Sequence, residues 1–521
     1  MPTSRSVSIS KHRAPAPRTA AVAVLALAGL VLSACSSAPS TDTSPPPETT
    51  LEAFYQQQVT FSDCQIPVST EGAGSAVDGT CGTIEVPIDY NEPAGDTAEL
   101  AVFRVPARGG DSIGSLLLNP GGPGSAGIGF AASSALALAD DPVSEQYDLV
   151  GFDPRGVGAS TPAIDCFTDA ERDTDVSPAS ALVSPLNTRP LVEACADSVG
   201  GVEALAHMGT VEAARDLDVM RQVLGDEKLS FAGVSYGTRL GAVYAQTFPD
   251  KVRSLVLDGP VDPLAETYDR RIDQFTGLQG AFDDLAAFCI EQGDCPLGDT
   301  AAGATTRYQQ LVQPLQDAPL PTVQGRDLTF TSANDAVVAG LYSKASWPAV
   351  IDGLSQLAEG RGDLLRALRD ISQGRAADGT YTNAQEAIVV YNCLDETRFS
   401  EQGQIDMIEA LHSAAPIFDT GRPVEGQAVP CAGWPSEPTL EYPYAVGIEN
   451  LPPTLAVAVT GDPLAPYDGA MSLADTLGSA LLTVEGDRHG VIMSGNECVD
   501  AIVASYLIDG DLPRSDVRCQ L

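Results

Sequence analysis

The chain has 521 residues, 44% of them hydrophobic, and a formal net charge of −41. This length exceeds that of one compact domain, so we expect one large core with an insertion, or two domains. The first 34 residues hold four of the 29 basic residues and none of the 70 acidic ones, which leaves −45 on the remainder. Such a surface repels nucleic acid and anionic membranes. It would either keep an exported protein soluble or attract cationic substrates.

The N-terminus predicts an export signal at residues 1–34. Basic residues precede an apolar stretch, Thr19 to Val31, that is too short for a comfortable membrane span. The stretch leads into Leu32-Ser-Ala-Cys35, which is similar to a bacterial lipobox. We therefore expect Cys35 to become the acylated first residue of a lipoprotein, with the lipid as its one membrane contact. The alternative is ordinary cleavage after Ala34, which would leave a secreted protein.

Cysteine usage also favours export. Of the 11 cysteines, ten remain after Cys35, an even number that suits a compartment permitting disulfides. Ten cysteines allow about 945 pairings, so the sequence leaves the connectivity open. Their order favours the pairing of neighbours: Cys64 with Cys81, Cys166 with Cys195, Cys289 with Cys295, Cys393 with Cys431, and Cys498 with Cys519. No C-x-x-C or H-E-x-x-H motif occurs, so we expect no metal, and nothing implies an organic cofactor.

Strands and helices alternate through the first half of the chain. Two segments alternate apolar and polar residues, as antiparallel strands do, and four apolar runs are typical of buried parallel strands. The former are Thr83–Asp89 and Ala98–Val105; the latter are Ile113–Asn119, Tyr147–Phe152, the run leading into Ser235, and Val252–Asp258. A helix is predicted over Val211–Leu224, capped by Gly225. This alternation predicts an α/β fold with a mostly parallel sheet and helices on both faces.

The rhythm changes after Gly259-Pro260. The following region is helical in pattern, for instance at Phe282–Ile290 and at Ser346–Leu357, where Ser346 is the expected N-cap. The sheet resumes at Thr454–Thr460 and Ala480–Glu485, before a last helix from Asn496 to Leu507. The predicted domains are a flexible tether at 35–60, a core at 61–261, a large helical cap at 262–440 and the rest of the core at 441–521.

The strongest sign of chemistry is Gly233-Val-Ser-Tyr-Gly237. It lies between an apolar run and an amphipathic helix that begins near Tyr236, the strand–turn–helix context of a nucleophile elbow. The two glycines lack Cβ atoms, which permits a tight bend with the serine in a strained conformation. The hydroxyl would stand over a helix N-terminus, whose dipole favours developing negative charge. We therefore predict Ser235 as a nucleophile.

A serine nucleophile of this type needs an acid and a base later in the chain. Of the four histidines, His489 alone follows the last predicted strand. His12 would leave with the signal, His207 precedes the elbow, and His412 lies in the predicted cap. The imidazole of His489 could take the proton of Ser235 and return it to the leaving group.

Asp462 is the predicted acid, because it follows the preceding strand and could hold the imidazole in one tautomer. Asp468 and Asp487 compete for this role. For the oxyanion hole we predict the backbone N–H groups of Tyr236, directly after the nucleophile, and of Gly122, in a Gly-rich turn after an earlier strand.

The chain resembles actinobacterial secreted α/β-hydrolases of the tripeptidyl aminopeptidase type, which are related to proline iminopeptidases. The resemblance covers the core from Asn119 to Asp262 and from Thr454 to Cys519, and the cap only loosely. It rests on Asn119-Pro-Gly-Gly-Pro-Gly124, Asp153-Pro-Arg-Gly-Val-Gly158, Gly233-Val-Ser-Tyr-Gly-Thr238, Leu257-Asp-Gly259, Gly461-Asp-Pro463, His489-Gly490, and Tyr506-Leu-Ile-Asp-Gly-Asp-Leu-Pro513 with Cys519. One departure is Ala465, where close relatives usually carry Thr.

The resemblance implies an α/β-hydrolase that cleaves short peptides from a free N-terminus and carries an acidic group for the substrate ammonium. Asp395 and Glu396 in the cap are candidates for that group, although surface charges are the preferred interpretation of both. Two rival functions remain open at this stage. One is an esterase or lipase on the same fold, and the other is a binding lipoprotein on a decayed hydrolase scaffold.

Overall fold

A computed structural model describes residues 50–70, 73–174, 188–424, 431, 433–515 and 517–521. The predicted signal at 1–34, Cys35 and most of the predicted tether lie outside these residues. Within the described part of the chain, no helix combines the length and apolarity that a bilayer span requires.

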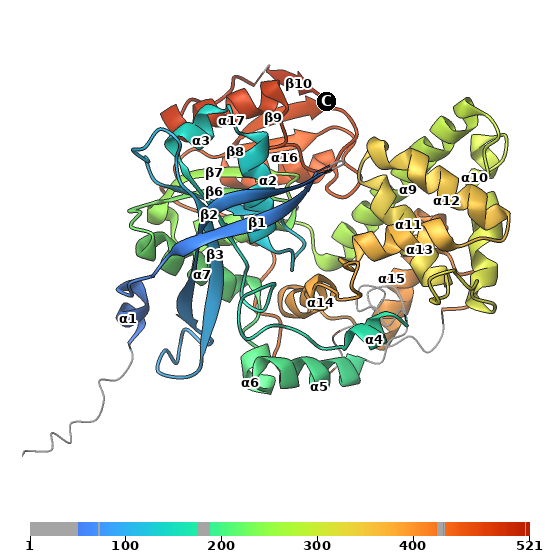
Figure 1. The fold of residues 1–521 in the computed structure, drawn as a ribbon, viewed down its shortest axis with the longest axis horizontal. Coiled ribbons are helices and arrows are strands. Elements are labelled where there is room, and N and C mark those ends of the chain that lie inside the picture. Colours follow the sequence, from blue (N-terminus) through green and yellow to red (C-terminus); the bar gives the residue numbers. More distant parts are fainter. Residues whose placement is uncertain (1–49, 71–72, 175–187, 425–430, 432, 516) are drawn as a thin grey trace, which may run out of the picture. The chain divides into compact units, whose positions relative to one another are not determined.

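A ten-stranded sheet forms the centre of the described residues (Figure 1). Its strands are β1 (Ser62–Thr70), β2 (Ala73–Pro87), β3 (Thr97–Val105), β4 (Ser115–Asn119), β5 (Asp148–Phe152), β6 (Leu229–Val234), β7 (Val252–Asp258), β8 (Leu455–Val459), β9 (Ala480–Glu485) and β10 (Arg518–Gln520). They lie in the order β1-β2-β3-β5-β4-β6-β7-β8-β9-β10. Strands β4 to β10 pair in parallel. The pairs β1–β2, β2–β3 and β3–β5 are antiparallel.

Helices cover both faces of the sheet because the central strands are apolar on both sides; every residue of β4 and β8 is buried. One hydrophobic cluster joins the sheet to α2 (Gly127–Ala137), α3 (Pro142–Gln146) and α17 (Glu497–Asp509). The other joins it to α1 (Leu51–Tyr55), α5 (Thr188–Val199), α6 (Val202–Leu205), α7 (Thr210–Val223), α8 (Tyr236–Thr247) and α16 (Tyr467–Leu477). This arrangement confirms the predicted fold class.

The chain between β7 and β8 is mainly helical in its described residues. Its helices are α9 (Thr267–Gln292), α10 (Ala301–Val312), α11 (Phe330–Leu341), α12 (Trp347–Ala358), α13 (Asp363–Ser372), α14 (Ala384–Asp395) and α15 (Glu401–Ala414). Helices α9 to α13 share a hydrophobic core of their own, which includes Phe282, Tyr308 and Leu354. This core makes them a separately packed layer.

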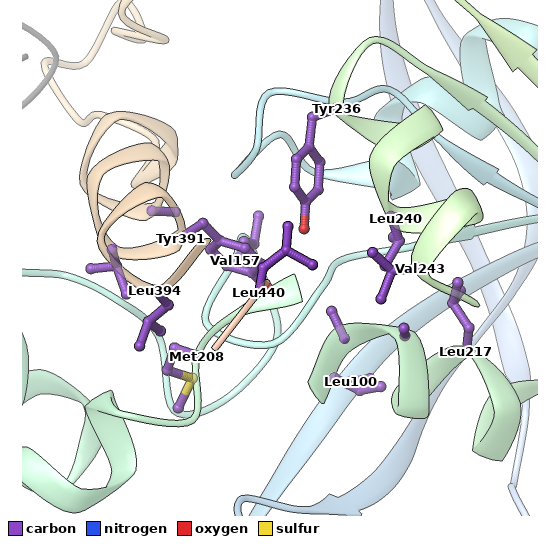
Figure 2. Close-up of a cluster of buried hydrophobic side chains, with 14 of the residues drawn as sticks. Leu100, Val157, Met208, Leu217, Tyr236, Leu240, Val243, Tyr391, Leu394 and Leu440 are labelled. Atoms are coloured by element: carbon purple, nitrogen blue, oxygen red, sulfur yellow. The ribbon is translucent and has the colours of Figure 1, made fainter. Parts of the chain in front are cut away.

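Helix α14 packs differently from these neighbours, since it belongs to the same hydrophobic cluster as α7 and α8. Figure 2 shows Tyr391 of α14 near Tyr236 of α8, and their ring centroids are 5.9 Å apart in an edge-to-face arrangement. The helix is therefore anchored directly on the sheet domain, close to the predicted nucleophile.

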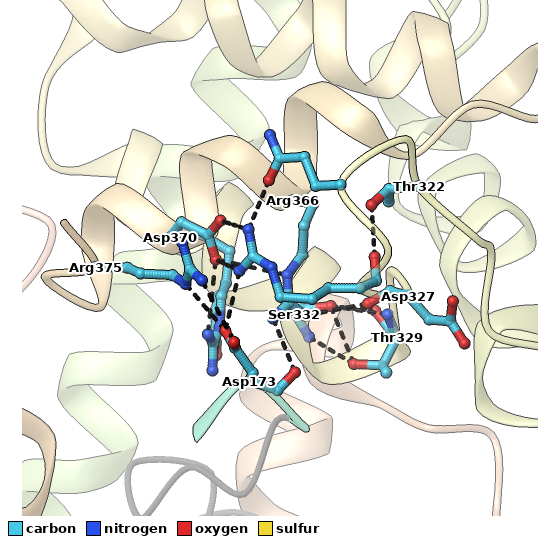
Figure 3. A network of polar contacts seen from close by, with 12 residues as sticks. Asp173, Thr322, Asp327, Thr329, Ser332, Arg366, Asp370 and Arg375 are labelled. Carbon is cyan, nitrogen blue, oxygen red and sulfur yellow. Dashed lines mark hydrogen bonds and ion pairs between the residues drawn. The ribbon is translucent and has the colours of Figure 1, made fainter. Parts of the chain in front are cut away.

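A polar network ties the short helix α4 (Asp169–Arg172) to the inserted helices (Figure 3). The Asp173 carboxylate accepts hydrogen bonds from Arg375 Nε and from the Tyr381 hydroxyl, each at 2.9 Å, and lies 3.4 Å from Arg326. Next to it, the Arg172 Nε donates to Glu386 of α14 at 2.7 Å. These contacts hold the inserted helices against the segment that follows β5.

Five disulfides join the cysteine pairs that the sequence order favours: Cys64–Cys81, Cys166–Cys195, Cys289–Cys295, Cys393–Cys431 and Cys498–Cys519. They link elements that are near in sequence, such as β1 with β2 and α17 with β10.

One local expectation differs from the structure, and one strand was not expected. Ser346 does occupy the N-cap position of α12, but its side chain makes no capping hydrogen bond. Its backbone is already helical, because a 3-10 turn, Lys344–Ser346, leads straight into the helix. The strand β1 was not expected from the sequence.

Candidate active site

Ser235 lies in a sharp turn between β6 and α8, with the strained backbone angles φ 57° and ψ −122°. A positive φ costs a non-glycine residue about 1–3 kcal/mol, so the surroundings must enforce it. A Cβ on Gly233 would lie 2.5 Å from the Gly237 carbonyl oxygen, and one on Gly237 would lie 2.9 Å from Asn119 Oδ1. Both glycines of the motif are thus required for the turn that presents the serine.

The Gly-rich turn after β4 packs against this serine. A Cβ on Gly121 would lie 3.0 Å from Ser235 Cβ and 3.2 Å from the Tyr236 nitrogen. Gly122 follows with φ 110° and, like Ser235 and Tyr236, lines the same cavity. Neither the Gly122 nor the Tyr236 N–H donates a hydrogen bond to another described residue. The two groups predicted for the oxyanion hole therefore remain available to a ligand.

His489 and Asp462 are directly paired. The Nδ1 atom of His489, in the loop after β9, lies 2.9 Å from each carboxylate oxygen of Asp462, in the loop after β8. The Asp462 side chain is fully buried, and its Oδ1 also accepts the N–H groups of Leu464 and Ala465, each at 2.9 Å. Two backbone N–H groups thus hold the carboxylate, and the carboxylate holds the imidazole.

Asp258, the last residue of β7, connects the serine turn with the histidine loop. Its backbone carbonyl accepts the Ser235 N–H at 2.7 Å. Its Oδ2 accepts the N–H groups of Val491 and Ile492, at 2.5 and 2.9 Å. In addition, a Cβ on Gly490 would lie only 2.7 Å from a Val234 methyl group. The residues flanking His489 and those flanking Ser235 are therefore in contact.

The pKa values of two ionisable groups of this site, His489 and Asp258, are raised. Burial lowers the pKa of His489, but the hydrogen bond and charge of Asp462, helped by Asp258, outweigh it and raise the pKa overall. Burial raises the pKa of Asp258 to about 6, an effect that the Ile492 and Val491 amides and His489 only partly offset. The raised pKa makes the neutral imidazole a stronger base than an ordinary histidine, which suits the acceptance of a proton from a nucleophile.

A cavity of about 980 Å³ lies beside Ser235, between the carboxyl edge of the sheet and the inserted helices. Asp462 and the turn residue Gly122 line it from the sheet, and residues of α9, α11, α13 and α14 line it from the insertion. A cavity of this size is in the range of pockets that bind a drug-sized ligand.

The remaining candidates occupy other places. His207, between α6 and α7, lies 3.6 Å from Asp89, which follows β2. His412 lies 3.7 Å from Asp419 in the insertion. Of the competing acids, Asp468 lines the cavity and Asp487 pairs with Lys344.

Asp395 and Glu396 are buried, with 0% and 8% exposure, so the preferred interpretation of both as surface charges was wrong. Asp395 accepts the N–H and the hydroxyl of Thr210. Glu396 is held by Arg270 and Arg271 and lines the cavity. Asp395 also lies 3.5 Å from Arg239 of α8, so both acids are buried beside arginines that come from distant elements.

A strained serine at a strand–helix turn, a His–Asp pair in the loops after β8 and β9, and two N–H groups without a partner among the described residues are features typical of a serine hydrolase. The family model for the alpha/beta hydrolase fold matches residues 114–495. The chain belongs to the α/β-hydrolase family, in agreement with the resemblance seen in its sequence.

Three relatives refine this assignment. The chain is 41% identical over 456 residues to serine protease Hip1 of Mycobacterium tuberculosis (strain ATCC 25618 / H37Rv), covering 84% of this chain and 87% of the relative. It is 38% identical over 451 residues to carboxylesterase B of the same organism, covering 84% and 86%. It is 33% identical over 460 residues to the tripeptidyl aminopeptidase of Streptomyces coelicolor, covering 84% and 82%. The chain is therefore a serine hydrolase.

Proposed function

We propose that this serine hydrolase is an exported peptidase that releases short peptides from free N-termini through an acyl-enzyme. The observation that carries the proposal is the cavity, which holds Ser235 between the sheet edge and the inserted helices. Relatives named serine protease and tripeptidyl aminopeptidase add support.

In this proposal the Ser235 hydroxyl attacks the scissile carbonyl while His489 Nε2 takes its proton. The Gly122 and Tyr236 N–H groups stabilise the resulting oxyanion. Asp462 stabilises the imidazolium through the two 2.9 Å contacts at Nδ1. The imidazolium then gives the proton to the departing amine, and water hydrolyses the Ser235 ester by the same steps in reverse.

An acidic end of the cavity supports the binding of a substrate ammonium. Asp262, Asp273 and Asp468 all line it. Burial raises the pKa of Asp273, and the charges of Asp269, Asp262 and Asp468 raise it further, which indicates that these carboxylates lie close together. Like charges gathered in this way favour a cation between them. We therefore assign the free amine of the substrate to this end rather than to Asp395.

A carboxylesterase is the second candidate, favoured by the relative that bears this name. Turnover of tripeptide amides with a free N-terminus, of the same peptides after N-acetylation, and of short acyl esters separates the two. The proposal expects free peptides to be cleaved, acetylated ones to be cleaved far more slowly, and Ser235→Ala to cleave none. Cleavage of esters alone would refute the peptidase and support the esterase.

The five disulfides support an oxidising compartment outside the cytoplasm. We propose that Cys35 anchors the protein to the outer face of the cell membrane by a lipid. Metabolic labelling with a fatty-acid analogue tests this: the wild type should carry the label and Cys35→Ser should not. An unlabelled wild type recovered from the medium would instead indicate the secreted form.

A further inference from the structure

The cavity beside Ser235 also has a basic end that the proposed reaction does not use. Arg239 of α8 and the neighbouring residues Arg270 and Arg271 of α9 line it together with Glu396, which follows α14. Two segments far apart in the sequence thus bring three guanidinium groups to one corner, in a chain whose net charge is −41. Such a concentration against the overall charge calls for a physical reason.

The first two arginines share a single carboxylate. Arg270 Nη2 lies 2.5 Å from one oxygen of Glu396, and Arg271 Nη2 lies 2.8 Å from the other. Burial alone would raise the pKa of Glu396, but the charges of the two arginines hold it at about 2. Glu396 therefore contributes one full negative charge against two positive ones.

Arg239 is more weakly compensated. Its side chain is 3% exposed, and its nearest carboxylate oxygen, on Asp395, lies 3.5 Å away. That carboxylate is already engaged by the Thr210 N–H at 3.2 Å and the Thr210 hydroxyl at 2.5 Å. Three guanidinium groups against two carboxylates leave at least one positive charge in a place with little water.

Buried hydrogen-bonding groups without a partner among the described residues also gather in this corner. The Nε atoms of Arg239 and Arg270 and the hydroxyl of Tyr442 are buried and have no partner among the described residues. Asn392 of α14 is 6% exposed and also lines the cavity. Buried donors without acceptors are costly, and an anion would supply the acceptors.

We propose that this corner, formed by Arg239, Arg270, Arg271 and Asn392, is a subsite for a carboxylate of the substrate. The inference rests on the proposed function, because the subsite shares its cavity with Ser235. Arg239 lies four residues after Ser235, which is about 6 Å along the helix axis. Since a peptide residue spans at most about 3.6 Å, the carboxylate lies within roughly three residues of the scissile bond.

Two groups of a peptide can supply such a carboxylate. One is the free C-terminus of a short peptide, whose amine would then occupy the acidic end of the same cavity. The other is an Asp or Glu side chain near the scissile bond of a longer chain. Both present the same planar anion that guanidinium groups bind.

The test measures binding to the full chain carrying Ser235→Ala, so that it does not depend on turnover. The probes are calorimetric titrations with tetraalanine and its C-terminal amide, and with amidated tetrapeptides that carry Glu or Gln at each position in turn. We expect the carboxylate member of at least one pair to bind about tenfold tighter, the scale of one charge-assisted hydrogen bond. The pair that shows the preference identifies the source of the carboxylate.

Charge variants locate the preference. Adding Arg239→Gln or Arg271→Gln should reduce it to less than about threefold, and Glu396→Gln should increase it, because each changes the net charge of the corner in that direction. The opposite sign for Glu396→Gln keeps the test informative if an arginine variant fails to fold. Arg422→Gln is the matched control, since Arg422 pairs with the exposed Asp317 and is not among the cavity-lining residues.

Equal binding of carboxylate and amide in every pair would overturn the subsite, as would a preference that survives Arg239→Gln and Arg271→Gln. The peptidase and the subsite fail separately. A carboxylate preference in the Ser235→Ala protein, with no peptide cleavage by the wild type, would retain the subsite and refute the peptidase. Cleavage of free peptides by the wild type, with equal binding of the two members of every pair including the Glu and Gln peptides, would do the reverse.

Discussion

The substitution Asp258→Asn should stabilise the protein relative to the wild type by an amount that grows from pH 4 to pH 8, and it should lower the activity. The Asp258 side chain is 0% exposed, and its raised pKa of about 6 follows from that burial. Its Oδ1 has no hydrogen-bond partner among the described residues, while Oδ2 holds the loop after His489. The carboxylate therefore serves the site at a cost in stability.

The sign and the size of this cost follow from proton linkage. The ordinary pKa of an Asp is 3.8, so between about pH 4 and pH 6 the native state binds more protons than the unfolded state. The free energy of unfolding then falls as pH rises through this window, by about 3 kcal/mol for a shift of about two pKa units. Asn does not ionise. Relative to the wild type, the variant should gain up to this amount between pH 4 and pH 8.

Thermal unfolding at one scan rate, from pH 4 to pH 8, measures the stability difference, and ester hydrolysis at pH 8 measures the activity. We expect the melting temperature of Asp258→Asn to rise by several degrees relative to the wild type across the series. Its kcat should fall about 10- to 100-fold, because charge-assisted hydrogen bonds to the histidine loop are lost. A melting-temperature difference that is constant with pH would refute the reasoning.

Three further outcomes follow from the structure. In the wild type, kcat/KM should rise with pH with a midpoint above 6.5, since the raised pKa of His489 must be passed to free the base. The substitution Asp462→Asn should lower kcat by about 10³–10⁴ and move this midpoint to lower pH. A midpoint that does not move would contradict the pairing of Asp462 with His489. Gly490 has φ 72° and an added Cβ would clash with Val234, so Gly490→Ala should reduce kcat/KM more than tenfold. Gly510 has φ 78° and open space around it, so Gly510→Ala should lower only the stability. Measuring kcat/KM and the melting temperature of both variants tests this difference. Asp173→Asn should destabilise the protein by about 1–2 kcal/mol at neutral pH, because Arg375, Tyr381 and Arg326 outweigh burial and lower the pKa of Asp173. The stability that the Asp173 carboxylate contributes is present above pH 3.8 and is lost as pH falls through the lowered pKa. Equal melting temperatures of the variant and the wild type at pH 7 would contradict this prediction.

The parallel core was predictable because its signals are local. Strands such as β4 and β8 are continuous apolar runs, and the glycines around Ser235 mark a turn that few other residues could make. Strand β1 escaped prediction because its sequence, with Pro67 and exposed polar residues, gains its structure from pairing with β2. Its stability lies in a non-local contact.

Charged residues in the site were harder to predict. Asp395 ends the apolar helix α14 and Glu396 follows it, but nothing local indicates that Arg239 and the arginines of α9 face them. The same holds for Asp258, whose role depends on amides 233 residues further along the chain. The apolar run Ala387–Cys393, which places both acids at the end of a buried helix, was the one signal that could have suggested their burial.

The most direct test of the account is covalent labelling of Ser235 by a fluorophosphonate, read by intact mass and peptide mapping. The account predicts one adduct per chain, on Ser235, that is absent in Ser235→Ala and much slower in Asp462→Asn. A folded wild-type protein without any adduct, or with the adduct on another serine, would contradict it and leave the hydrolase scaffold with a different nucleophile or a binding role.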